Sequence, residues 1–264
     1  MVELPNSRHY SPVRPLLRFL LVLCTLTWWV LPGMGLIDLS VTWDREWPVM
    51  LEAGWGVLFT VGLGLPFLVA AIWPRLARVT LAQLYVVTAA LLVGVVAGLE
   101  PQSWWIFVGL LIEVPLVHAI APDGGLTKAG PHWPLLALGV VALPVGLVYA
   151  WDMAELNRMS LPTSDITNDV DHYAVQAAVG LALIALPMAA SLWPATRRLL
   201  GTSSALMAFY LGLVSYSWPL ADGGFSTGWS VAVMVWAVAV LVASWWPVRT
   251  REPEVSVDPV SVAA

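Results

Sequence analysis

Glu113 is the residue whose chemical type fits its surroundings least. It lies about midway along an apolar run, residues 103–121, and Pro115 follows it two positions later. An ionisable group at the centre of a membrane span costs about 3 kcal/mol or more and marks function by default. No Lys, Arg or His is expected at its depth, so desolvation favours the neutral acid. Two interpretations remain open: a protonated acid that donates a hydrogen bond to a neighbouring helix, or a proton- or cation-handling site that faces an internal cavity.

Glu52 and His172 form a second candidate site, in which the two side chains act as an acid–base pair. They are 120 positions apart in the sequence, and each is expected about one helical turn inside the outer membrane surface. Asp169 and Asp171 precede His172, and a histidine beside carboxylates titrates near neutral pH, so it can bind a metal or respond to pH. The alternative is an interfacial histidine at a helix start that one of these aspartates caps.

The segment before His172 places side-chain oxygens at alternate positions, in Asp165, Thr167, Asp169 and Asp171. Asp165, Asp169 and Asp171 resemble the spacing of a calcium loop, but the glycine and the bidentate glutamate that such a loop requires are missing. The sequence therefore predicts no EF-hand. These three aspartates and His172 remain weak candidates for attracting a divalent cation.

Several motifs that carry chemistry elsewhere are absent from the sequence. It contains no phosphate-binding glycine loop, no G-x-S-x-G and no H-E-x-x-H. The single cysteine, Cys24, excludes an internal disulfide and is expected to pack within a span. The four histidines are scattered rather than paired. We expect no cofactor and no nucleic-acid partner.

Composition indicates that these residues sit in a lipid bilayer. The chain has 264 residues, of which 59% are hydrophobic and 11% charged, with a mean hydropathy of +0.80; a soluble domain carries about 25% charged residues. A span needs about 20 apolar residues, and in hydrocarbon its backbone must form a helix. The sequence predicts an all-α integral membrane protein with eight transmembrane helices, at 16–36, 49–73, 79–98, 103–121, 133–151, 172–192, 199–218 and 228–247.

Charge predicts the orientation, because Lys and Arg prefer the cytoplasmic side. With alternate loops assigned inside, ten of the twelve Lys and Arg are cytoplasmic, and eleven of the seventeen Asp and Glu, including Asp38, are outside. Both termini are then in the cytoplasm. Paired tryptophans such as Trp28-Trp29 are expected at the membrane interface, where indole rings prefer to lie. One Lys against eleven Arg, with abundant Ala, Val, Gly and Pro, suggests a bacterial source, and hence the bacterial cytoplasmic membrane.

The chain also shows signs of duplication. Residues 70–78 (AAIWPRLAR) and 190–198 (ASLWPATRR) align at an offset of 120, which maps the first four spans onto the last four. This predicts two parallel four-helix repeats. The alternative is that these residues only mark the end of a span. Trp then anchors the span at the membrane interface, Pro ends the helix, and Arg holds that end on the cytoplasmic side. The expected organisation is an N-terminal segment 1–15, a first half 16–121, a linker 122–132, a second half 133–247 and a disordered tail 248–264.

Small residues recur at helical spacing in two spans, at Gly94 and Gly98 and at Ala174, Ala178 and Ala182. Such stripes let helices approach closely, within the chain or against another membrane protein or a second copy. Three functions follow from the candidate residues. The first is transport or sensing of a small cation, proton or polar solute through Glu113. The second is a non-catalytic partner subunit, and the third is a membrane-embedded enzyme that acts on a lipid or isoprenoid.

Overall fold

The computed structural model describes residues 13–44, 49–127, 130–159, 172–219 and 221–247, and within them every regular element is a helix. The elements, in chain order, are α1 (Val13–Trp29), α2 (Gly35–Val41), α3 (Val49–Val57), the π-helix η1 (Leu58–Gly64), α4 (Leu65–Ile72), the 3-10 turn η2 (Pro74–Leu76), α5 (Ala77–Gly98), the 3-10 turn η3 (Pro101–Ser103), α6 (Trp104–Ile120), α7 (Trp133–Arg158), α8 (Tyr173–Leu192), the 3-10 turn η4 (Pro194–Thr196), α9 (Arg197–Ser217) and α10 (Thr227–Trp245).

Seven continuous helical segments in the described part of the chain are long and apolar enough to cross a membrane, so the chain is a multi-pass membrane protein. They are Val49–Ile72, Pro74–Gly98, Pro101–Ile120, Trp133–Arg158, Tyr173–Leu192, Pro194–Ser217 and Thr227–Trp245. The prediction of a continuous first span at 16–36 is wrong. That segment is broken into α1, which ends at Trp29, and the short helix α2, which begins at Gly35.

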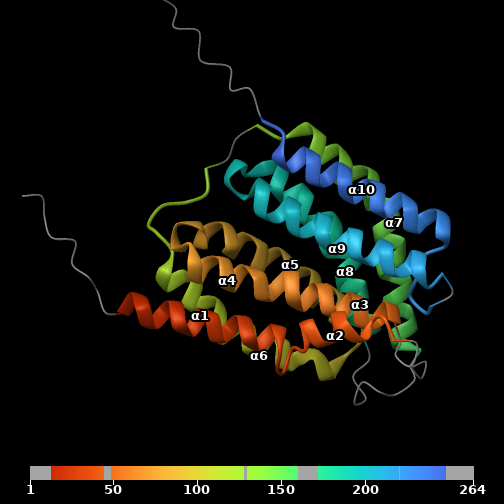
Figure 1. The fold of residues 1–264 in the computed structure, drawn as a ribbon, viewed down its shortest axis with the longest axis horizontal. Coiled ribbons are helices and arrows are strands. Elements are labelled where there is room, and N and C mark those ends of the chain that lie inside the picture. The colour runs from red at the N-terminus through yellow and green to blue at the C-terminus, as the bar shows by residue number, and fades with distance from the viewer. Residues whose placement is uncertain (1–12, 45–48, 128–129, 160–171, 220, 248–264) are drawn as a thin grey trace, which may run out of the picture.

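Four spans form the centre of the molecule (Figure 1): the composite span α3–η1–α4, with α5, α8 and α9. Most of their residues are buried, whereas less than a third of the residues are buried in the spans that contain α6, α7 and α10. α1 and α6 pack together on one side of this centre, and α7 and α10 pack together on the other. Peripheral helices that expose Leu, Val and Ile are what a lipid environment allows, because lipid solvates these side chains.

The W-P sequences of the two aligned segments end their helices in the same way. Trp73, at φ −122° and ψ 78°, follows α4, and Trp193, at φ −123° and ψ 104°, follows α8; a 3-10 turn then starts at the proline in each case. A proline has no N–H to continue the helix, and it restricts the preceding residue to extended backbone. Each W-P therefore turns the chain into the next span, α5 or α9.

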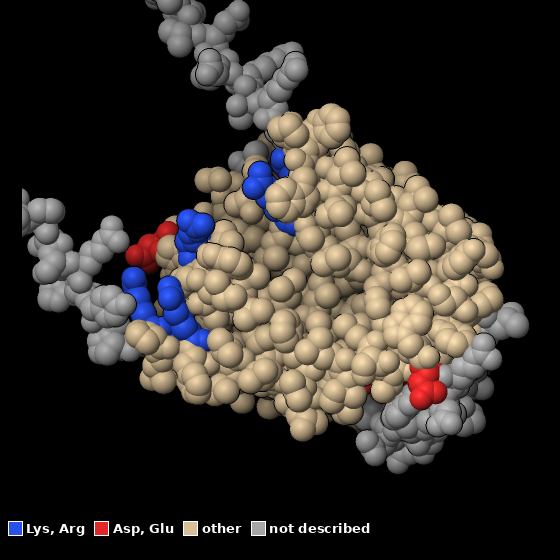
Figure 2. Space-filling model, in the orientation of Figure 1, with Lys and Arg blue, Asp and Glu red and all other residues tan. Residues whose placement is uncertain are grey.

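Charged side chains gather at the two ends of the helices. Figure 2 shows no charged residue across the middle of the visible face, with the arginines at the end where α1 begins and α10 ends. A charge-free band between two charged ends fits a bilayer core between two aqueous surfaces.

The helix that includes Asp152 and Glu155 extends further than expected. Residues 152–158 were predicted to lie in an outer loop, but α7 continues through Arg158. Asn157 explains the extension, because it donates to Gly98 O and accepts from Ala174 N at 2.8 Å. It thereby pairs backbone groups at the end of α5 and the start of α8, which would otherwise lack partners.

Candidate functional site: two buried acid clusters beside a broken helix

The break in the first segment lies against the end of α1. Pro32 cannot donate a backbone hydrogen bond, and a Cβ on Gly33 would lie 2.6 Å from the Cα of Trp28, so only glycine lets the chain turn back here. Gly33 donates to Thr27 O at 2.8 Å, and its own carbonyl accepts from the Trp55 indole at 2.8 Å. Side chains of neighbouring helices therefore satisfy irregular backbone inside the molecule, as a membrane interior requires.

The π-helix η1 lies beside this break and presents three carbonyls to side chains of other elements. Thr60 O accepts from the Trp29 indole at 2.9 Å, while the Gln83 amide donates to Val61 O at 2.8 Å and to Gly62 O at 3.3 Å. π-Helical turns within α-helices are frequent at functional sites. The first segment and α5 thus both hold the irregular turn of the composite span.

Glu113, on α6, is buried against α1, and its carboxyl group bonds to three side chains there. The Trp28 indole donates to Glu113 Oε2 at 2.5 Å, and Thr27 and Cys24 also form hydrogen bonds with this carboxyl group. The carboxyl group therefore contacts a neighbouring helix, with Trp28 as the donor. That contact lies in the last turns of α1, immediately before the break.

Trp28 is an internal residue, so the prediction that it anchors the chain at the membrane interface is wrong. It is 0% exposed and stacks on Phe59 and Trp105, with ring centroids 5.5 and 6.0 Å away. The reason is the early end of α1, which leaves Trp28 inside the protein rather than at the membrane surface. Cys24 was expected only to pack, but it also contacts Glu113.

A second acid cluster joins α2 to α3. Asp38 was predicted to lie in an outer loop, but it lies in α2, is 6% exposed, and is hydrogen-bonded through its side chain to Glu52, which is 2% exposed. Two carboxyl groups in such contact cannot both ionise without strong repulsion, so they favour sharing one proton.

His172 completes this cluster, together with Gln176 from α8. His172 Nδ1 lies 3.7 Å from Glu52 Oε1, and the imidazole stacks on Trp55 with centroids 4.2 Å apart. Glu52 and His172, predicted as a pair, are therefore adjacent. Four buried atoms here form no hydrogen bond within the described residues: Asp38 Oδ2, Glu52 Oε1, His172 Nδ1 and Gln176 Oε1. The cluster retains capacity to accept or donate further hydrogen bonds, which a proton or a small polar ligand can use.

The remaining site candidates gain no support from the geometry. Asp165, Asp169 and Asp171 lie outside the described residues. Among the residues that are described, no three His, Cys, Asp or Glu side chains are arranged to hold a metal ion.

The small-residue stripes are occupied inside the molecule. A Cβ on Gly94 would lie 2.5 Å from Ala174 O and 3.0 Å from the Cβ of Ala178, and a Cβ on Gly98 would lie 3.0 Å from that of Ala174. Ala182 is also fully buried. The stripes bring α5 against α8, so they are not an open surface for another protein or a second copy.

Searches against known protein families, curated proteins and solved structures found no match to the chain. The two acid clusters are therefore the features of the molecule that point to a function.

Two residues of these clusters, and one that supports the π-helix beside them, were missed from the sequence. Asp38 was read as a loop residue, Trp28 as an interfacial anchor, and Gln83 was not singled out. Pro32-Gly33 within the expected first span signalled the break. The signal for Gln83 was a polar amide inside an apolar run.

Proposed function

We propose that this protein handles protons in the bacterial cytoplasmic membrane, in transport or in sensing, through Glu113 at the midplane and the Asp38–Glu52 pair nearer the outer surface. In this proposal α1 and α2 together form one broken crossing. The chain then crosses the membrane eight times, with both termini in the cytoplasm. The arginines at the end where α1 begins and α10 ends support this orientation.

The observation that carries the proposal is that the broken segment contacts both acid clusters. Trp28, before the break, bonds to Glu113, and Asp38, after the break, bonds to Glu52. A shift of either half-helix would change the hydrogen-bond partners of one carboxyl group. Discontinuous helices at the midplane are how many transporters build ion sites, because the broken backbone can move and its polar groups can bind.

A proton suits these groups better than a metal ion. The Glu113 carboxyl contacts the neutral side chains of Trp28, Thr27 and Cys24, which hydrogen-bond a carboxyl group but form no cation cage. Asp38 and Glu52 contact each other directly, an arrangement that one shared proton stabilises. Each site can gain or lose a proton without a change in its fold.

The decisive experiment is proton flux in liposomes. Purified protein is reconstituted with a pH-sensitive dye inside, and valinomycin with a potassium gradient sets the membrane potential. We expect flux above that of empty liposomes, and we expect Glu113→Gln to abolish it, because an amide cannot release a proton under these conditions. The matched control is Glu155→Gln, which changes an exposed acid of α7. A wild-type rate equal to that of empty liposomes would remove the transport form of the proposal.

A sensing role is tested by the phenotype of a deletion strain across external pH. Wild-type protein should restore a pH-dependent phenotype, and Glu113→Gln should fold but fail to restore it. If Glu113→Gln keeps full activity both in the flux assay and in this complementation, the buried acid is structural and the proposal fails.

We also propose that the two halves are duplicates related by an axis along the membrane normal. Two residue pairs at the offset of 120 support this, because equivalent residues of a two-fold repeat meet only near its axis. Glu52 lies beside His172, and Ser203 donates to Gln83 Oε1 at 2.9 Å. The first pair is near the outer end of the spans and the second nearer the other end, so the line between them runs across the membrane. An experimental structure in which 65–98 does not superpose on 185–218 by such a rotation would contradict the duplication.

The proposed orientation has a separate test in a Cys24→Ala background. A cysteine in place of Asp222 should react with an impermeant maleimide added to intact cells, whereas one in place of Asp123 should react only after the cells are opened. The reverse labelling pattern would invert the proposed topology.

A further inference from the structure

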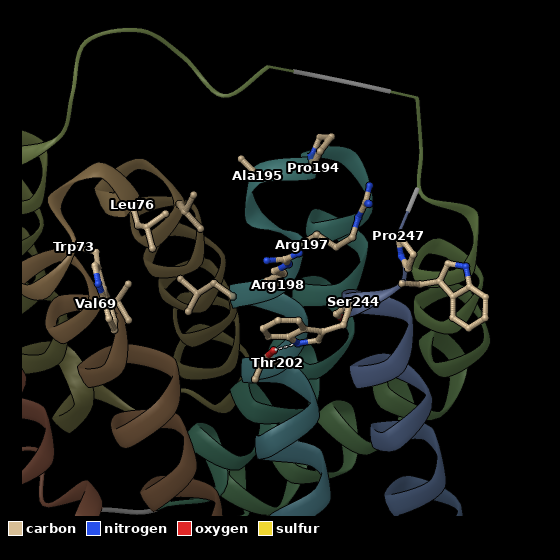
Figure 3. A pocket seen from close by; sticks show the side chains of 14 residues that line it. Val69, Trp73, Leu76, Pro194, Ala195, Arg197, Arg198, Thr202, Ser244 and Pro247 are labelled. Carbon is tan, nitrogen blue, oxygen red and sulfur yellow. Dashed lines mark hydrogen bonds between the residues drawn. The ribbon is translucent and has the colours of Figure 1, made fainter. Parts of the chain in front are cut away.

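A pocket of about 700 Å³ opens at the arginine-bearing end of the helices, away from both acid clusters. One wall comes from α4, η2 and α5, with Trp73 and Leu76, and the other from α9 and α10, with Arg197, Arg198 and Trp245. Figure 3 shows these two walls facing each other, with the Arg198 side chain directed into the space and the Arg197 side chain extending towards Pro247. We call this space the arginine pocket.

Two charged residues line the arginine pocket, Arg197 and Arg198, and both are cations. Arg197 and Arg198 form no ion pair with any acid of the described residues, and Arg197 Nε is buried without a hydrogen-bond acceptor. Both residues stand in the first turn of α9, where positive charge is unfavourable to the helix dipole. Helix stability therefore does not explain their position.

His132 lies close enough to Arg197 to feel its charge. Burial, and then the positive charge of Arg197, lower the pKa of His132 below its usual value. Histidine cannot supply the negative charge that would offset Arg197, and no acid of the described residues pairs with either arginine.

The rest of the arginine pocket is suited to hydrocarbon. Val69, Leu76, Val79 and Leu199 line it, and the Arg198 guanidinium lies 4.8 Å from the Trp245 ring centroid. The Trp245 indole donates to Thr202 Oγ1 at 3.1 Å, as the dashed line in Figure 3 marks, which fixes this wall. Paired cations above an apolar floor match an amphiphile with an anionic head. Basic pockets between transmembrane helices bind such headgroups.

We infer that the arginine pocket binds an anionic phospholipid of the surrounding leaflet, with its phosphate on Arg197 and Arg198 and its upper acyl chains against the apolar wall. The lipid would contact the α4–α5 corner and the α9–α10 corner together. A free phosphate would use only the arginines and leave the apolar lining of this volume unexplained.

The test is native mass spectrometry of the full chain in detergent, titrated with phosphatidylglycerol or with phosphatidylcholine. We expect wild-type protein to bind phosphatidylglycerol at least tenfold more tightly. Each of Arg197→Gln and Arg198→Gln should weaken that binding about fivefold, which corresponds to about 1 kcal/mol for one arginine. Arg75→Gln is the matched control, because Arg75 is exposed at the same end but does not line the pocket. Arg197→Lys should retain the lipid, since it keeps the charge.

Four outcomes would overturn the inference. The first is equal affinity of the wild-type protein for the two lipids, a result that does not depend on the folding of any variant. The second is unchanged binding after both arginines are replaced. The third is displacement of the lipid by millimolar inorganic phosphate, which would assign the pocket to a soluble phosphate compound. The fourth is lipid binding only after Glu252→Gln and Glu254→Gln, which would assign the pocket to the acidic C-terminal segment of the chain.

Discussion

The bond between Trp28 and Glu113 makes a quantitative prediction about stability. Glu113→Leu removes the acceptor for a fully buried indole N–H. Thr27 keeps a partner after this change, because its hydroxyl also donates to Leu23 O at 3.1 Å, and the Cys24 thiol is a weak donor. The unpaired indole is therefore the main cost, and we expect a loss of about 1–2 kcal/mol in the free energy of unfolding. Glu113→Gln keeps a carbonyl acceptor and should cost about 0.5 kcal/mol or less.

A double-mutant cycle isolates this one contact. Trp28→Phe removes the donor but retains a ring that can stack on Phe59 and Trp105. If the bond exists, Glu113→Leu should cost about 1 kcal/mol less in the Trp28→Phe background than in the wild type. The assay is reversible unfolding in mixed micelles of increasing dodecyl sulfate fraction, followed by circular dichroism.

The matched control for the donor is Trp104→Phe, since Trp104 is 49% exposed at the start of α6. Its cycle with Glu113→Leu should show no coupling. A Trp28–Glu113 coupling as small as that of this control would refute the bond, and with it the contact between α1 and Glu113.

Two further predictions concern packing and the central polar contacts. Gly54→Ala places a Cβ 1.5 Å from Gln176 Oε1, so the fully buried Gln176 must move. We expect a loss of about 1–3 kcal/mol in the free energy of unfolding. The control Gly228→Ala, whose Cβ would have no atom within 4 Å, should be neutral in the same unfolding assay. Gln83→Leu leaves two carbonyls of η1 and the Ser203 hydroxyl without their partner, so it should destabilise the protein by about 2 kcal/mol, against about 1 kcal/mol for Ser203→Ala. Equal effects of these two variants would mean that Gln83 does not support the π-helix.

The sequence was sufficient to predict an all-α membrane protein and most of its spans. Seven apolar runs became helices at nearly the expected residues, because a span must bond its own backbone and must be apolar over about 20 residues. Both conditions are local, so a window along the sequence detects them. Glu52 and His172 were named as one candidate acid–base pair because they occupy equivalent places at the offset of 120, and their contact became visible only in the fold.

The break in the first segment was decided by tertiary contacts. The run 16–36 satisfies the criteria for a span, and Pro32-Gly33 only permits a break. Two hydrogen bonds stabilise the broken form: the Trp29 indole donates to Thr60 O, and the Trp55 indole donates to Gly33 O. Trp55 and Thr60 both belong to the composite span, which follows in the chain. A local pattern cannot contain a hydrogen bond to a distant residue.

The sites depended on tertiary structure for the same reason. Glu113 stood out in the sequence because its type conflicts with its depth, which is a property of one residue and its neighbours in the chain. Its bond to Trp28, the contact of Asp38 with Glu52 and the support of η1 by Gln83 join residues from different helices. Which face of each helix is buried, and against which neighbour, depends on packing of the whole bundle, and in a bilayer apolar residues on either face are equally well solvated. The identity of each partner was therefore set by the fold and not by the local sequence.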